Sequence, residues 1–200
     1  DLEKALKWVV QNCDAYNVAS VNLSLGLTVP GTDRGYNDTV SDTTWMSDEF
    51  ASLKSNGVFV CAAAGNDYAY YAPQQGVAYP ASDPNVFAVG SVGTNDRGGP
   101  FSWEDGATDY STSTDALAAM SQRSTVLTDV FAPGGEVYSG INGNNYRWYS
   151  GTSMASPQVA GFAAIAQQAA LEYLGRKLTV DELSNIITDN ADTIYDGDDE

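Results

Sequence analysis

A serine among small residues, at the start of a helical segment, is the best candidate nucleophile in this sequence. Ser153 lies in "GTSMASPQVAG", where Gly151 and Ala155 let a substrate and the backbone approach closely. The first amides of a helix have no partner within the helix and carry partial positive charge, so negative charge that develops there is stabilised. The same pattern also fits a plain N-cap, a role open to Ser153 and Thr152 alike.

Two strand ends could add polar groups to such a site. In "AAAGN" a run of tiny residues ends at Gly65 and Asn66, and in "NLSLG" a run ends at Gly26. At the carboxyl edge of a parallel sheet the Asn66 amide would project into the crevice where ligands bind, and it could donate to an oxyanion. Gly26 leaves room for an extended peptide alongside. The alternatives are a loop asparagine with an unusual backbone and an ordinary strand end.

The segments that position these residues alternate between helical and strand patterns. Helices are predicted at 1–14, 43–57, from 151 onward and at 179–188, and strands at 18–26, 58–65, 85–93 and 123–133. The strands at 58–65 and 85–93 are continuously apolar, as expected for central strands covered on both faces. This order predicts an α/β domain with a layered parallel sheet. The polar stretches 27–42 and 94–120 are interpreted as insertions.

Composition narrows the class of partner. The net charge of -17 argues against nucleic acid or an anionic membrane surface as partner. The hydrophobic fraction of 43% is that of an ordinary folded protein. No apolar run approaches the roughly 18 residues of a membrane span. Cys13 and Cys61 are too few for a disulfide framework, and their disulfide state stays open. Cys61, in "GVFVCAAAG", is predicted to be a small buried hydrophobic residue.

Several motifs together resemble the subtilisin-like serine protease family. "VNLSLG", "AAAGN", "YPASDPNVFAVGSV", "FAPG" and "GTSMASP" followed by "VAG" occur in the family's order, between about residues 4 and 172. The resemblance implies a three-layer parallel sheet with helices on both faces, in one partial domain over residues 1–200. It also implies a secreted, extracellular endopeptidase acting on proteins or peptides. Family members often bind structural calcium, and although the acidic loops here would allow it, no stretch has convincing ligand spacing.

Family roles carry over to matching positions only. Ser153 looks like the nucleophile, and Asn66 like the side-chain oxyanion donor, with the backbone amide of Ser153 as the second donor. Ser24, Leu25 and Gly26 resemble the strand that pairs with the substrate backbone. Four residues resemble the wall of the pocket that binds the residue preceding the cut: Ala62, Ala63, Ala64 and Gly65.

One departure from the family pattern limits what this chain can do. Family members supply an aspartate and then a histidine before the serine, whereas this sequence has no histidine and none of its 26 acidic residues lies in a matching motif. We therefore expect the base on polypeptide N-terminal to this chain, and no proteolysis by the chain alone. The missing part should also contribute strands to the sheet, so an open edge should pair with that segment or with a second copy.

Two other functions compete with the protease. A degenerate family member could serve as a non-catalytic binding or scaffold module, although such a module does not need an oxyanion amide facing a nucleophile. An unrelated α/β-hydrolase is disfavoured, because "GTSMA" lacks the second glycine of the Gly-x-Ser-x-Gly turn and no histidine follows it.

Overall fold

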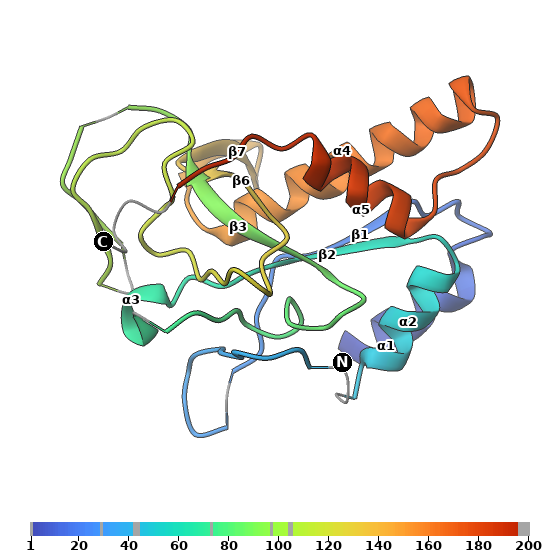
Figure 1. Ribbon diagram of the computed structural model, residues 1–200, viewed down its shortest axis with the longest axis horizontal. Helices are drawn as coiled ribbons and strands as arrows, with labels where there is room; N and C mark the ends of the chain where they lie inside the picture. The colour runs from blue at the N-terminus through green and yellow to red at the C-terminus, as the bar shows by residue number, and fades with distance from the viewer. Residues whose placement is uncertain are drawn as a thin grey trace.

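A parallel sheet forms the centre of the protein, whose computed structural model describes residues 2–28, 30–41, 45–72, 74–96, 98–103 and 106–195. The sheet has the order β1-β2-β3-β6, and every pairing within it is parallel (Figure 1). Its strands are β1 (Ser20–Leu23), β2 (Phe59–Ala63), β3 (Phe87–Gly93) and β6 (Val130–Gly135). β1 is an edge strand, and its outer side has no strand beside it in the described part of the chain.

Helices cover both faces of this sheet, as the family resemblance implies. α1 (Leu2–Asn12) and α2 (Ser47–Ser55) lie on one face, and α4 (Thr152–Tyr173) and α5 (Val180–Asp189) lie on the other (Figure 1). Alternate residues of β2 supply the two cores: Val60 packs toward α1 and α2, and Phe59 toward α4 and α5. The expected three-layer α/β architecture is therefore confirmed.

Small residues let α4 lie close to the sheet. Its buried face includes Ala155, Val159, Ala163 and Ala170, which pack on residues of β2, β3 and β6. Bulky side chains there would push the helix outward, and with it the helix N-terminus where Ser153 lies.

No helix in the described ranges is long and apolar enough to cross a membrane.

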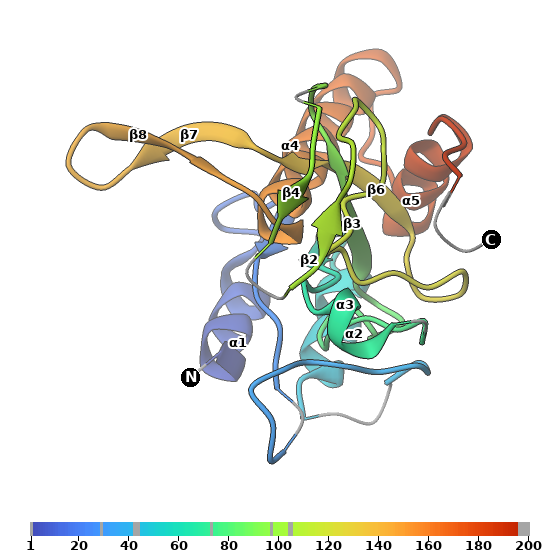
Figure 2. The same cartoon turned by 90° about the vertical axis from the view of Figure 1, so that its left-hand side faces the viewer.

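The other elements are short or peripheral. α3 (Tyr68–Tyr71) follows the end of β2, and β4 (Phe101–Ser102) pairs with β5 (Thr108–Asp109) inside the 94–120 insertion. β7 (Val137–Ile141) and β8 (Asn145–Tyr149) form a hairpin that projects from the body of the molecule (Figure 2). The sequence did not predict α3 or the β4–β5 pair, because neither has enough residues to show a periodicity.

The predicted last helix is α5, which begins with a capping box. The Thr179 hydroxyl accepts from the Glu182 amide at 3.1 Å, and the Thr179 amide donates to the Glu182 carboxylate at 2.8 Å. β6 extends to Gly135 instead of ending at Pro133, and its pairing with β3 shifts register between Val92 and Gly93.

Candidate active site

Ser153 lies in the first turn of α4 with its side chain half-buried. The N-cap of the helix is Gly151, so the interpretation of Ser153 or Thr152 as the N-cap is wrong. An amide in the first turn has no acceptor within the helix, which leaves the Ser153 N–H available to a ligand. The Ser153 hydroxyl donates to the Ser24 carbonyl oxygen over 3.5 Å, a long and weak interaction.

A proline fixes the neighbourhood of the nucleophile. Pro157 has no amide hydrogen, so it cannot donate to the Ser153 carbonyl four residues earlier as a helical residue would. The Ser24 hydroxyl donates to that carbonyl instead, at 2.7 Å. Nearby, the Ser156 hydroxyl donates to the Asn22 side chain at 2.7 Å. These two bonds tie the segment at the end of β1 to the start of α4.

Thr152 holds the side chain of Asn66. The Asn66 Oδ1 accepts from the Thr152 amide at 2.9 Å and from the Thr152 hydroxyl at 3.0 Å. The same hydroxyl accepts from the Gly65 amide at 3.1 Å. Because these bonds occupy the carbonyl side of the Asn66 amide, its NH₂ group is the part left to bind an anionic oxygen. The loop interpretation of Asn66 is wrong in one respect: the positive φ lies at Gly65, at 116°, and not at Asn66.

One cavity joins the candidate catalytic groups. Ser153 and Asn66 both line a space of about 230 Å³, together with Leu25, Gly26, Ala63 and Gly65; we call it the small-walled cavity. Glycine is needed in this wall, because a Cβ on Gly26 would come within 2.9 Å of the Ala78 Cβ.

Two predicted wall residues do not reach this cavity. Ala62 and Ala64 are fully buried in the core beneath α1 and α2, because alternate residues of a strand point to opposite faces of its sheet. Of the four predicted wall residues, Ala63 and Gly65 line the cavity. Ser24 is exposed beside the cavity and contacts α4 through its hydroxyl.

Two residues that support the site are not predicted from the sequence. The sequence predicts Thr152 only as a possible cap, although its position next to Ser153 is a signal for a supporting role. Gln122 is 1% exposed, and its backbone amide donates to the Gly65 carbonyl at 2.9 Å while its side chain donates to the Gly35 carbonyl at 2.9 Å. Gln122 thereby connects the 27–42 insertion to the end of β2, and no motif in the sequence marks it.

The arrangement lacks a general base. The 200 residues contain no histidine, and the acceptor that the structure gives the Ser153 hydroxyl is a carbonyl oxygen, which takes up no proton at neutral pH. Asp33 and Asp67 line the small-walled cavity, and both lie beside Arg34, whose guanidinium is 3.8 Å from Asp33 and 2.6 Å from Asp67. These groups could hold a carbonyl oxygen and present a hydroxyl to its carbon. Deprotonating that hydroxyl requires a further group.

Neither metal nor thiol chemistry is evident at the site. Within the described ranges, no three His, Cys, Asp or Glu side chains gather as a metal cluster would. Cys13 and Cys61 are buried free thiols, and burial raises the pKa of Cys61 to about 11. Cys61 therefore behaves as the small buried residue that the sequence predicts.

Comparisons with known proteins identify a family that matches the whole chain. The profile of the subtilase family matches residues 1–200. Subtilisin DY of Bacillus licheniformis is 30% identical over 192 residues, which cover 96% of this chain and 56% of the relative. Subtilisin amylosacchariticus of Bacillus subtilis subsp. amylosacchariticus is 31% identical over 160 residues, which cover 80% of this chain and 32% of the relative.

Solved structures show the same fold. The prenylagaramide maturation protease PagA superposes with a TM-score of 0.69 at 23% identity, over 98% of this chain and 58% of that structure. Sphericase superposes with a TM-score of 0.65 at 22% identity, over 94% of this chain and 54% of that structure. In each of these comparisons the chain spans less than two thirds of its relative.

Proposed function

Because the chain belongs to the subtilase family, we propose that it is the nucleophile-bearing and oxyanion-binding part of a serine endopeptidase that cleaves proteins or peptides. The observation that carries this proposal is that Ser153 and Asn66 line one cavity while Thr152 fixes the orientation of the Asn66 amide. A scaffold module would not need an amide donor held in place beside a serine hydroxyl.

The proposed chemistry is attack by the Ser153 oxygen on a peptide carbonyl. The side chain of the residue preceding the cut would enter the small-walled cavity, and the backbone of the substrate would lie along residues 24–26. As the carbonyl oxygen becomes negative, the Asn66 NH₂ group and the Ser153 amide would each donate to it. Losing the Asn66 donor should lower kcat about 10²- to 10³-fold, the size measured for such a donor in a subtilisin.

We propose that a histidine, with an aspartate to orient it, is supplied by polypeptide outside these 200 residues, because the chain has no histidine. We propose that this polypeptide adds a strand to the open edge of β1. It would also cover the outer face of α4, where Ile165 is 67% and Leu171 46% exposed and no charged residue occurs from 152 to 171. Alone, the chain should be inactive and should self-associate through this edge. We propose an extracellular location, and we assign no ligands for structural calcium.

Labelling with a fluorophosphonate tests the proposal, because this reagent modifies activated serines. The 200-residue chain would be labelled alone and after mixing with the Asp- and His-bearing N-terminal segment of a subtilase. We expect labelling only after mixing. Ser153→Ala should abolish it, and Ser102→Ala, a change at an exposed serine of β4, should not.

Two results would overturn the proposal. Labelling in neither state would favour the scaffold module, provided that size-exclusion chromatography shows the two polypeptides associated. Labelling that survives in the Ser153→Ala variant would mean that another serine is the nucleophile.

A further inference from the structure

A second and larger cavity adjoins the small-walled cavity at Asn66. It has a volume of about 740 Å³, within the range of ligand-binding pockets, and Asn66 and Asp67 line both spaces. Phe101 and Trp103 of the 94–120 insertion lie on one side, and Trp148 and Tyr149 of β8 are also in its lining. We call this space the aromatic cleft.

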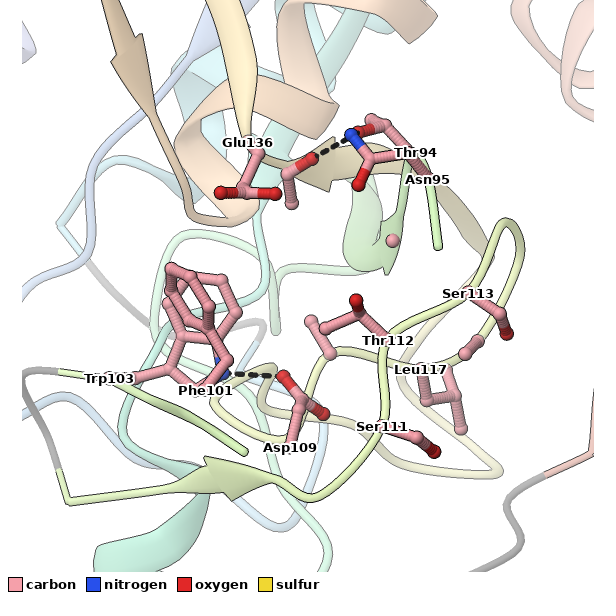
Figure 3. Close-up of a pocket in the computed structure, with 14 residues that line it drawn as sticks. Thr94, Asn95, Phe101, Trp103, Asp109, Ser111, Thr112, Ser113, Leu117 and Glu136 are labelled. Atoms are coloured by element: carbon pink, nitrogen blue, oxygen red, sulfur yellow. Dashed lines mark hydrogen bonds between the residues drawn. The ribbon is translucent and has the colours of Figure 1, made fainter. Parts of the chain in front are cut away.

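The aromatic side chains of the insertion are held in place. The Phe101 and Trp103 rings pack with their centroids 4.9 Å apart, and the Trp103 indole N–H donates to Asp109. The other oxygen of Asp109 accepts from the Ala119 amide at 3.0 Å, which fixes the carboxylate. Figure 3, a close-up of a neighbouring pocket that Phe101 and Trp103 also line, shows the two rings together and a dashed line from Trp103 to Asp109. A rigid aromatic surface loses little conformational entropy on binding.

Charge in the aromatic cleft is balanced, unlike charge in the chain as a whole. Its charged lining residues are Arg34, Asp67, Glu136 and Arg147, two of each sign, and Arg34 is paired with Asp67 at 2.6 Å. The chain carries a net charge of -17. The cleft therefore presents an aromatic surface to a ligand and has no net charge from its lining residues. This combination favours binding of a neutral aromatic side chain over a charged one.

We propose that the aromatic cleft binds the first residues after the scissile bond and selects an aromatic side chain there, with Trp103 as a specificity-determining residue. This inference rests on the proposed function. If the residue before the cut occupies the small-walled cavity and the carbonyl oxygen lies at Asn66, the chain after the cut leaves on the far side of Asn66. The aromatic cleft is the cavity that adjoins the small-walled cavity at Asn66, since Asn66 belongs to both linings, and we take it as the space that receives this chain.

Peptide binding to the 200-residue chain tests the inference without catalysis. The ligands are Ala-Ala-Ala-amide, Phe-Ala-Ala-amide and Ala-Phe-Ala-amide, each with a free amino terminus, titrated by NMR while the indole N–H of Trp103 is followed. We expect at least one phenylalanine peptide to bind between about twofold and tenfold more tightly than the alanine peptide, the range contributed by one aromatic pair. Binding should shift the Trp103 resonance.

Variants separate the aromatic cleft from its surroundings. Trp103→Ala should remove the preference for phenylalanine, and so should Phe101→Ala, which guards against local misfolding in the first variant. Tyr110→Ala is the matched control, because Tyr110 belongs to the same insertion, is 84% exposed and lines neither cavity. Tyr138→Ala tests a neighbouring cavity of about 850 Å³ that Tyr138 lines and Trp103 does not.

Each contrary result is decisive. Equal affinity for the three peptides, no binding of any, or loss of the preference in Tyr110→Ala would overturn the inference. If the Tyr138→Ala variant loses the preference for phenylalanine and the Trp103→Ala variant keeps it, the selectivity belongs to the neighbouring cavity. Fluorophosphonate labelling reports separately on the proposed function. If the complemented enzyme is labelled but the chain shows no preference for phenylalanine peptides, the inference about the aromatic cleft is wrong and the proposed function stands.

Discussion

Replacing Thr152 with valine should destabilise the protein and misalign the oxyanion donor. The side chain is fully buried, and its hydroxyl makes one bond to Asn66 at 3.0 Å and one to Gly65 at 3.1 Å. Valine keeps the shape but leaves the Gly65 amide without this acceptor, a loss of about 1–3 kcal/mol in the free energy of unfolding. Taking about 2 kcal/mol, and a Tm shift of roughly 2–4 °C per kcal/mol for a chain of this size, we expect Tm to fall by about 4–8 °C.

The assay is a thermal melt followed by circular dichroism, with Thr152→Ser as the matched control. Serine keeps the hydroxyl and loses only a methyl group, at about 1 kcal/mol. The labelling rate of the complemented enzyme should fall about fivefold in the valine variant, because one neutral hydrogen bond is worth about 1 kcal/mol. If the valine variant melts at or above the temperature of the serine variant, the hydroxyl is not the group that links α4 to the end of β2.

Three further predictions concern other parts of the chain. Gly65→Ala should cost about 2 kcal/mol or more in urea denaturation, because φ is +116° and a Cβ would overlap the Gln122 side chain. The side chain of Glu49 is 5% exposed, and its Oε1 lies 3.6 Å from the Lys7 Nζ. Burial raises the pKa of Glu49, so its protonated form is favoured in the folded state. Stability should therefore fall as pH rises from 4.5 through the folded-state pKa, and Glu49→Gln should flatten urea midpoints across that range. Cys61, whose pKa is about 11, should not react with iodoacetamide at pH 8 until urea unfolds the protein.

Matched controls accompany these predictions. Gly31→Ala also places a side chain at positive φ, but in open space, so it should cost less than Gly65→Ala. Glu172→Gln changes an exposed carboxylate and should leave the pH profile of the wild type intact. Cys61→Ala should halve the labelling in urea, since Cys13 remains. If Gly31→Ala and Gly65→Ala lower the free energy of unfolding equally, the argument for Gly65 is wrong. A Glu49→Gln variant whose urea midpoint still falls with pH contradicts the argument for Glu49. Rapid labelling of Cys61 in the folded protein contradicts the argument for its buried thiol.

The sequence predicted the layers of the fold because the central strands are apolar without interruption. β2 is buried at all five positions, and a strand of this kind requires cover on both faces. It could not predict which alanines face the cavity, because Ala62, Ala63 and Ala64 are identical in type. Only the register of β2 assigns Ala63 to the side of α4 and its neighbours to the core.

The supporting parts of the site were harder to predict, because they depend on contacts between distant segments. Gln122 reaches Gly35 across 87 positions of sequence, and no local pattern indicates such a contact. Phe101 and Trp103 lie in an insertion without periodicity, and their relation to Asn66 appears only when the cavity between them is formed.

The bonds between Thr152, Asn66 and Gly65 join segments 86 and 87 positions apart in sequence. Two backbone amides, those of Thr152 and Gly65, donate within this one network. Neither can open to solvent by fraying of its own segment, because the start of α4 and the end of β2 must first separate. Their deuterium uptake should therefore follow a single opening event, and hydrogen exchange at these amides reports directly on how often the two halves of the site come apart.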